Sequence, residues 1–386
     1  MPIVLVCLLF TFPTKVKAIE VRGDIVKVAK EAGYEVNPQN APKSSIVIDA
    51  DSGDILWGDQ IDLERDPASL SKLMTLYLFY EHMAEKGLSL TDTITATPSD
   101  EAISQLYEIS NNNLVAGVAY PIKDLIIATL VPSSNASTIV LANYLSKNDA
   151  DAFIRKMNQT AKELGMTHTR FYNASGAVAR AFQGYYQPKD YDLEAHNITT
   201  AKDLAILVYH FLKKYPDVLS YTKTPEISIM TGTPYQETFT AYNHSLPGSD
   251  YAFTGVDGLK TGSSPSAAFN GIVTAKQGDT RLITVVMGVG DWRDQNGEYY
   301  RHPFINALLT KGFKDYPQYL KEKKAGTEFQ TISNQKTESP KEVAKAVAKP
   351  KKISSHNRFN YFLVIVIVLM TSLMLILIAY LIFLKR

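Results

Sequence analysis

The sequence predicts a mixed α/β (α+β) fold, in which helices flank an antiparallel sheet and a helical subdomain is inserted into the chain. Strand-like segments occur early and late in the sequence, whereas helical patterns fill the middle. Strands so far apart in sequence must pair with each other to bury their apolar faces in one sheet. A globular core is also indicated, because 45% of the 386 residues are hydrophobic and the formal net charge is only 40 − 39 = +1.

The predicted elements follow in chain order. Segment 44–58 contains two short β-rich runs around an Asp-Ser-Gly-Asp sequence, which is typical of a hairpin. Five segments have the apolar spacing of helices, namely 69–86, 122–130, 136–145, 150–164 and 200–214. Strand character returns in 267–276 and 280–289, which flank Gln-Gly-Asp as a second hairpin. The last amphipathic stretch, 304–316, is expected to cover the sheet.

The composition excludes several classes of protein. A near-neutral charge argues against a nucleic-acid-binding protein that works through bulk basicity. The single cysteine, Cys7, cannot form a disulfide within the chain or supply a cysteine-based zinc site. The seven histidines include no pair at the spacing of metal ligands, so we expect no metal and no other cofactor.

The N-terminal residues 1–18 have the pattern of a secretory signal peptide. Ile3–Phe12 is almost wholly apolar, and Val16 and Ala18 are small residues at the −3 and −1 positions of a cleavage site. The expected positive charge before the apolar run is missing, so we expect the true start to lie further upstream. A buried strand and an uncleaved anchor are the alternatives for this segment.

The C-terminal residues have the pattern of a membrane anchor. Residues 361–384 carry no charge, and as a helix of about 36 Å they would cross a bilayer of roughly 30 Å. We expect one transmembrane helix there, with 385–386 as its cytoplasmic end. The preceding segment 324–360 is expected to be a basic flexible linker, with a short helix as the alternative. Residues 19–360, which comprise the domain 19–323 and the linker, would then lie outside the cell, tethered to the membrane.

The first chemical motif is Ser69-Leu70-Ser71-Lys72, at the start of the predicted helix 69–86. Residues three apart share a helix face, so the Lys72 amine is placed to take the proton of the Ser69 hydroxyl. This reaction requires a neutral amine, and burial or a neighbouring cation would keep it neutral. Taken alone, the motif is weak evidence for function, because it occurs by chance in many proteins and a serine that caps a helix is the alternative.

Two further motifs follow. Ser133-Ser134-Asn135 lies between two apolar helices, where a loop can project a hydroxyl and an amide into a cleft; a helix N-cap is the alternative. Lys260-Thr261-Gly262-Ser263 is expected on an edge strand, beside which a substrate backbone can pair as an added strand; an ordinary turn is the alternative.

In this order, S-x-x-K, S-x-N and K-T-G mark the serine acyl-transferases that include penicillin-binding proteins and serine β-lactamases. The segments PASLSKLM, LVPSSNAS, KELGMTHTRFYNASG, ITTAKDLAIL and VDGLKTGSSPSAAFNGIV resemble low-molecular-mass penicillin-binding proteins of the D-alanyl-D-alanine carboxypeptidase family. The resemblance covers residues 43–315 and is strongest to Gram-positive, membrane-anchored members. It implies the serine β-lactamase/transpeptidase-like fold.

The resemblance also implies a role for each motif residue. Ser69 would attack the carbonyl of the penultimate D-alanine of a peptidoglycan pentapeptide, with Lys72 as the base. Ser133 would relay a proton to the leaving amine, and Asn135 would hold Lys72 and the substrate amide. The remaining implied roles belong to the third motif: Lys260 keeps Lys72 neutral, Thr261 meets the terminal carboxylate, Gly262 lets the substrate approach, and the Ser263 N–H joins that of Ser69 in an oxyanion hole. A β-lactam would acylate Ser69.

Two functional alternatives remain open. A membrane-anchored serine β-lactamase has the same motifs, although no Glu-x-x-Leu-Asn string occurs between the second and third of them. An inactive wall-binding homologue is the other alternative, but it would be expected to lose the nucleophile or the lysine. Within the enzyme class, the balance of hydrolysis and transpeptidation is open. Segment 177–198 is an insert that either lines the cleft or forms a surface loop.

Overall fold

The computed structural model describes residues 16–17 and 23–332 of the 386-residue chain. The chain divides into units 1–334 and 335–386, and every described residue belongs to the first unit. Most of the predicted signal peptide, the linker beyond residue 332 and the predicted span 361–384 lie outside the described residues. Among the residues described, no helix combines the length and apolarity needed to cross a membrane.

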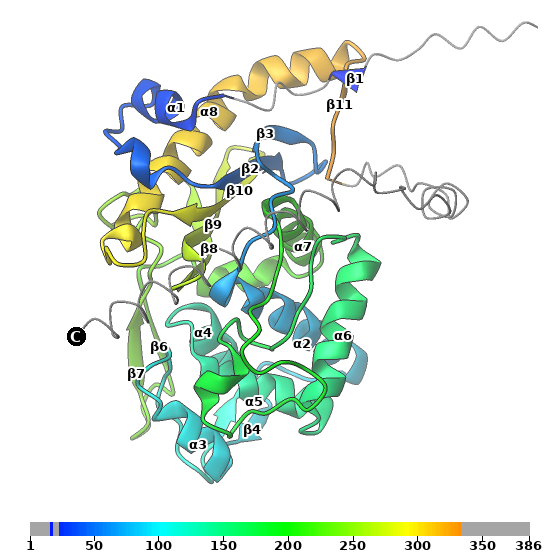
Figure 1. Ribbon diagram of the computed structural model, residues 1–386, viewed down its shortest axis with the longest axis vertical. Helices are drawn as coiled ribbons and strands as arrows, with labels where there is room; N and C mark the ends of the chain where they lie inside the picture. The colour runs from blue at the N-terminus through cyan, green and yellow to red at the C-terminus, as the bar shows by residue number, and fades with distance from the viewer. Residues whose placement is uncertain (1–15, 18–22, 333–386) are drawn as a thin grey trace, which may run out of the picture. The chain divides into compact units, whose positions relative to one another are not determined.

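A five-stranded antiparallel sheet forms the centre of this unit (Figure 1). Both predicted hairpins are confirmed, and the predicted edge strand lies at one end of the sheet. The strands follow the order β3 (Ile55–Asp59), β2 (Ser44–Asp49), β10 (Thr280–Val289), β9 (Ala268–Gln277) and β8 (Val256–Ser264). The early hairpin therefore joins the late strands through the β2–β10 pair, as the sequence pattern predicts.

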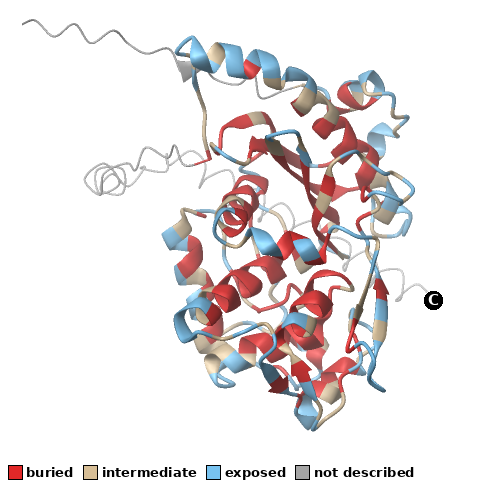
Figure 2. Ribbon diagram, turned by 180° about the vertical axis from the view of Figure 1, so that it is seen from behind, coloured by how far each residue is buried: buried red, intermediate tan, exposed pale blue. Residues whose placement is uncertain are grey.

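Alternation along the strands gives the sheet two buried faces. Val47 and Val286 pack with α1 (Ile25–Glu31) and α8 (Gly297–Lys324) on one face. Ile46 and Val285, their neighbours along the same strands, belong to the core shared with the helical region on the other face. Every residue of β2 is buried, and Figure 2 shows the buried positions concentrated where sheet and helices meet.

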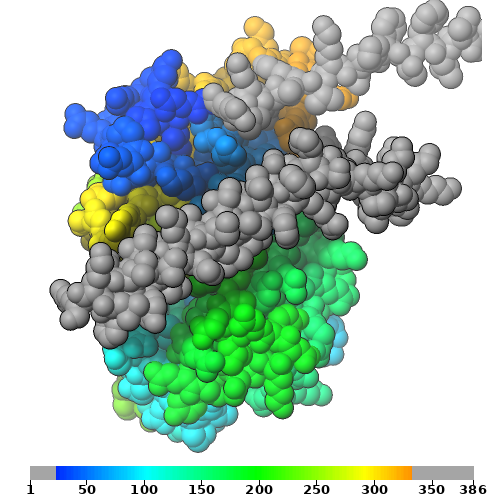
Figure 3. Space-filling view, in the orientation of Figure 1, coloured from blue at the N-terminus to red at the C-terminus, as the bar shows by residue number. Residues whose placement is uncertain are grey.

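The helical region between the strands covers the face of the sheet opposite α1 and α8. Its main helices are α2 (Lys72–Lys86), α4 (Ile122–Leu130), α5 (Asn135–Ser146), α6 (Ala150–Leu164) and α7 (Ala201–Lys214). Its smaller elements are α3 (Pro98–Ser104), the strand pairs β4 (Thr93–Thr95) with β5 (Ala119–Pro121) and β6 (Glu226–Ile229) with β7 (Glu237–Thr240), and the 3₁₀ turns η2 (Ala68–Ser71), η3 (Ala179–Phe182) and η4 (Pro216–Tyr221). A further 3₁₀ turn, η1 (Pro38–Asn40), precedes β2. In Figure 3 the cyan and green surface of the helical region lies at the bottom of the view, and the blue and yellow surface of the sheet region lies at the top.

Two of the predicted helices have different bounds in the structure. The predicted helix 69–86 is a 3₁₀ turn, η2, followed by α2, so Ser69 precedes the α-helix. The predicted segment 304–316 is only the middle of α8, which runs through Pro303 and Pro317. Proline usually ends a helix, but the apolar face of α8 is buried against the sheet, and this packing outweighs the lost hydrogen bonds.

The first residues of the predicted linker pack against the body. β11 (Glu328–Phe329) pairs in parallel with β1 (Val16–Lys17). The Ile55 N–H donates to Gln330 O at 2.9 Å, and Ile332 is only 3% exposed. The folded domain therefore extends to the end of the described residues rather than ending at residue 323.

Candidate active site

Ser69 lies in a 3₁₀ turn whose backbone is fixed from the preceding residues. Asp66 Oδ1 accepts the Ala68 N–H at 2.7 Å, and the Leu70 N–H donates to Pro67 O at 3.1 Å. Ala68 has a left-handed backbone with φ of +47°, an uncommon conformation that costs a non-glycine residue about 1–3 kcal/mol. The hydrogen bond from the Ala68 N–H to the Asp66 side chain forms an Asx turn that helps to hold this conformation just before α2.

Two glycines let other segments approach this turn closely. A Cβ on Gly176 would lie 1.9 Å from Ala68 O, and one on Gly262 would lie 3.0 Å from the Ser69 nitrogen. Gly176 also has a φ of +93°, which favours glycine. The predicted substrate-binding residue Gly262 thus has a packing role: it seats β8 directly beside the Ser69 backbone.

Lys72 is completely buried and its amine has three partners. Its Nζ atom lies 3.0 Å from Ser69 Oγ, 2.9 Å from Asn135 Oδ1 and 2.9 Å from Ser175 O. Burial lowers the pKa of Lys72 well below its ordinary value, and the charge of Lys260 lowers it further. The structure therefore favours a neutral amine in contact with the serine hydroxyl.

A neutral Lys72 amine can satisfy all three of its partners. A neutral amine has two N–H donors and one lone pair, and Asn135 Oδ1 and Ser175 O accept but cannot donate. Those two oxygens account for both N–H groups. The lone pair is then left for the Ser69 hydroxyl, which is the arrangement that proton abstraction requires.

The second motif lies at the start of α5. Ser134 is the N-cap of this helix, because its Oγ accepts the Ser137 N–H at 3.0 Å. Asn135 is fixed by Ser110, whose carbonyl accepts from its backbone and its side-chain nitrogens at 2.8 and 2.9 Å. Ser133 has a left-handed φ of +61°, and its buried hydroxyl has no hydrogen-bond partner among the described residues. A buried hydroxyl without a hydrogen bond costs free energy, so a ligand that hydrogen-bonds to Ser133 would be favoured.

The third motif lies on the edge strand β8, as predicted. Lys260 is 2% exposed and its Nζ donates to Thr261 O at 2.8 Å. Burial, followed by the charge of Arg301, lowers the pKa of Lys260 to about 7. Ser263 Oγ donates to Glu298 Oε1 at 3.0 Å. The edge position leaves one side of β8 without a strand partner within the sheet.

The sequence analysis missed Arg301 and Glu298, which lie in the first turns of α8. The fully buried Arg301 guanidinium forms an ion pair with Glu298, and desolvation lowers its pKa. No motif spacing reveals this pair, because the packing of α8 against β9 brings it to the third motif. The signal available in the sequence was an i, i+3 charge pair at a helix start.

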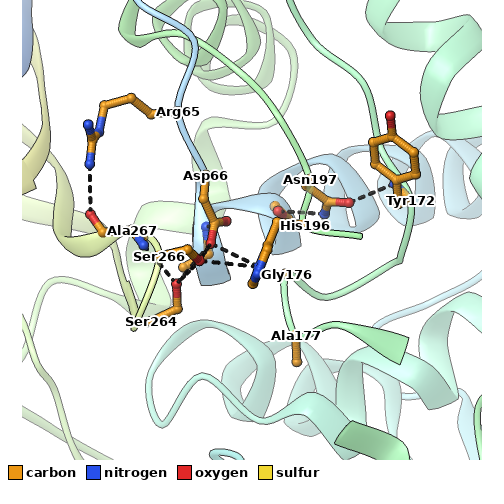
Figure 4. Close-up of polar contacts among 12 residues, drawn as sticks. Arg65, Asp66, Tyr172, Gly176, Ala177, His196, Asn197, Ser264, Ser266 and Ala267 are labelled. Carbon is orange, nitrogen blue, oxygen red and sulfur yellow. Dashed lines mark hydrogen bonds and ion pairs between the residues drawn. The ribbon is translucent and has the colours of Figure 1, made fainter. Parts of the chain in front are cut away.

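Asp66 connects the nucleophile turn to β8 and to the long loop before α7 (Figure 4). Its Oδ2 accepts from Ser264 Oγ at 2.8 Å, also accepts from Ser266 Oγ, and lies 3.2 Å from His196 Nδ1. The Asp66 carbonyl accepts from Asn270 Nδ2 at 3.0 Å. One carboxylate therefore sets the relative positions of three segments that surround Ser69.

A residue of the insert 177–198 helps to hold the turn that supplies the Ser175 carbonyl. The Ala174 N–H donates to Tyr186 Oη at 3.2 Å, and Thr75 Oγ1 donates to Ala174 O at 2.6 Å. Tyr186 is 3% exposed, whereas Tyr185 is 50% exposed. Segment 177–198 is thus more than a surface loop, because its inner side supports the acceptor of the Lys72 amine.

All three predicted motifs are brought together. Ser69, Lys72 and Asn135 form one hydrogen-bonded group, and Lys260 acts on Lys72 through its charge. β8 adjoins the turn that carries Ser69. This arrangement has a nucleophile, a base of lowered pKa and an open strand edge, which together suit acyl transfer to a serine.

Comparison with known proteins places these features in a family. The family model described as D-alanyl-D-alanine carboxypeptidase matches residues 31–291. The D-alanyl-D-alanine carboxypeptidase DacF of Bacillus subtilis is 26% identical over 276 residues, which are 71% of this chain and 62% of that protein. The chain therefore spans less than two thirds of the length of this curated relative.

Solved structures show the same fold. A peptidoglycan synthesis regulatory factor (PBP3) from Streptococcus pneumoniae has a TM-score of 0.63 at 28% identity, over 70% of each chain. Penicillin-binding protein D2 from Listeria monocytogenes in its ampicillin-bound form has a TM-score of 0.54 at 27% identity, over 70% of this chain and 97% of that one. The predicted serine β-lactamase/transpeptidase-like architecture agrees with these neighbours.

Proposed function

Because the chain belongs to the D-alanyl-D-alanine carboxypeptidase family, we propose that it is a serine-type D-Ala-D-Ala carboxypeptidase that acts on peptidoglycan stem peptides. The observation that carries this proposal is the 3.0 Å contact between Ser69 Oγ and the buried Lys72 amine. The bound ampicillin of the Listeria neighbour supports the related proposal that β-lactams acylate this chain.

The acylation step follows from the contacts of Lys72. The lone pair of the neutral amine takes the Ser69 proton as Oγ bonds to the carbonyl carbon of the penultimate D-alanine. The backbone N–H groups of Ser69 and Ser263 then stabilise the oxyanion, and the close approach of Gly262 to Ser69 supports this pairing. The proton passes to the leaving D-alanine nitrogen through the unpaired hydroxyl of Ser133. The peptide C–N bond breaks and an ester on Ser69 remains.

The second step removes the acyl group from Ser69. Water adds to the ester carbonyl, Lys72 accepts a proton, and Ser69 leaves with its hydroxyl restored. Lys260 and Thr261 bind the substrate terminus along the edge strand β8. A β-lactam forms the same ester when its ring amide opens, and a slow second step would then trap the enzyme.

The proposed site of action is the outer face of the cell membrane. The proposal depends on the apolar segments 1–18 and 361–384, which we assign to a signal peptide and a single C-terminal anchor. A basic tether before the anchor would let the domain reach wall peptides.

Intact-mass spectrometry of the full chain in detergent, over a time course with benzylpenicillin, tests the proposed function. We expect one persistent adduct per chain, located on the peptide that contains Ser69, and no adduct on Ser69→Ala. Release of D-alanine from a D-Ala-D-Ala pentapeptide should be lost in the same variant. Rapid loss of penicillin without a lasting adduct would indicate a β-lactamase instead.

A further inference from the structure

A carboxylate of the protein itself occupies the region beside the third motif. Glu298 Oε1 accepts from Ser263 Oγ at 3.0 Å, and Glu298 Oε2 is paired with the Arg301 guanidinium. The Arg301 side chain is 0% exposed and that of Glu298 is 25% exposed. Glu298 is therefore the member of the pair that solvent and ligands can reach.

Glu298 is also the anion that neutralises Arg301 within the described part of the chain. The other partners of the guanidinium are Asn270 O and Tyr242 O at 3.3 Å and His302 Nε2 at 3.4 Å. The carbonyls are uncharged, and burial lowers the pKa of His302 well below its ordinary value, so its imidazole is neutral. The charge of Arg301 is thus balanced by one carboxylate.

Glu298 is held in this position from two directions. It lies in the first turn of α8, where the helix dipole stabilises a negative charge. Its spacing of three residues from Arg301 places both side chains on one face of the helix. The carboxylate is therefore set by the fold rather than by chance contact of a mobile side chain.

We propose that Glu298 is a specificity-determining residue, because its carboxylate occupies Arg301 and Ser263, two groups that would otherwise help Lys260 and Thr261 to bind a ligand carboxylate. This inference rests on the proposed function, because it concerns the ligands of that same site. A ligand with a free carboxylate must displace Glu298 or lie beside a like charge, whereas a neutral ester meets neither obstacle. The native chain should therefore prefer a carboxylate ligand over its neutral ester less strongly than a chain without the Glu298 charge does.

Acylation rates of two ligands that differ only in charge test the proposal. The second-order rate constants for benzylpenicillin and its methyl ester are measured on full-length chains in detergent. The variants are Glu298→Gln, which keeps an oxygen acceptor for Ser263, and Glu85→Gln as a control. Glu85 is an exposed glutamate paired with Lys86, so its substitution changes the net charge equally.

We expect Glu298→Gln to raise the acid-to-ester rate ratio about tenfold or more, since an interaction with a charged group becomes available to the ligand. Glu85→Gln should keep the native ratio. An unchanged ratio in Glu298→Gln, or a lower one, would overturn the proposal. Glu298→Ala provides the same comparison if the glutamine variant unfolds, as judged by its thermal transition.

Failure of the proposed function gives a different result. If a folded native chain is acylated by neither ligand, then it is not a penicillin-binding enzyme, and the role assigned to Glu298 falls with it. If the native chain is acylated and only the ratio fails to respond, then the enzyme assignment stands and Glu298 has no part in ligand selection.

Discussion

The phenolic oxygen of Tyr186 lies 3.2 Å from the backbone nitrogen of Ala174, one residue before the carbonyl that binds the Lys72 amine. An aromatic side chain from the insert 177–198 thereby supports the base of the proposed reaction. Because Tyr186 is almost completely buried, its hydroxyl cannot be replaced by water without rearrangement.

We expect Tyr186→Phe to lower the free energy of unfolding by about 1–3 kcal/mol, since the buried Ala174 N–H loses its acceptor. Acylation by benzylpenicillin should slow as the Ser175 carbonyl loses its fixed position. Tyr185→Phe is the matched control, because Tyr185 is exposed and should change neither quantity. Chemical denaturation and acylation kinetics measure the two effects, and equal behaviour of both variants would contradict the supporting role.

The charge of Lys260 should control the pH dependence of acylation. Lys260 lowers the pKa of Lys72, so Lys260→Gln should raise that pKa and move the acidic limb of the second-order rate profile to higher pH. Each unit of increase lowers the neutral fraction of Lys72 about tenfold below its pKa. In the native chain, loss of the Lys260 proton near its pKa of about 7 should give an alkaline limb that the variant lacks. Rate profiles with the same acidic limb would exclude this coupling.

Asp66 should matter for both stability and acylation, and two variants separate its contacts. Asp66→Ala removes the acceptor of the Ala68 N–H, so we expect a loss of about 1–3 kcal/mol in the free energy of unfolding and slower acylation. Asp66→Asn keeps an oxygen for that N–H and should retain more of both. Native acylation rates in a folded Asp66→Ala chain would show that Ser69 does not depend on this hydrogen bond.

The close approach of β8 to the nucleophile turn can be tested with one methyl group. In Gly262→Ala the added Cβ would lie 2.9 Å from Pro67 O and 3.0 Å from the Ser69 nitrogen, so the turn must shift. We expect acylation to fall at least tenfold, since a displacement of about 1 Å at a reacting group commonly costs a hundredfold. Gly278→Ala is the control: it meets no atom within 4 Å and has a φ of +58°. It should cost stability of about 1 kcal/mol but leave acylation unchanged.

Much of the fold could be predicted because periodicity is a local property. The hairpins at 44–58 and 267–289 and the five helices follow from apolar spacing and turn residues. The 3₁₀ turn at Ser69 could not be predicted, since it depends on the hydrogen bond between Ala68 and Asp66 and on glycines more than a hundred residues away. The full length of α8 was hidden by its prolines, which the packing against the sheet tolerates.

Part of the candidate site could also be predicted from the sequence. Motif spacing identified Ser69, Lys72, Asn135 and Lys260, and the structure brings these residues together. Motif spacing could not identify Ser175, because this residue contributes a backbone carbonyl, which any residue type could supply. Arg301 and Glu298 were missed for another reason: only the packing of the C-terminal helix brings them to the site.

The order of the strands determines when the chain can complete its fold during synthesis. Asp49 of β2 pairs with Leu282 of β10, which lies 282 − 49 = 233 residues later, so the middle of the sheet closes only when most of the chain is present. Contacts of such long range slow folding. A partly synthesised chain would contain Ser69 and Lys72 but lack β8, and it should not react with penicillin. The onset of covalent labelling would therefore report the time at which the last strands join the sheet.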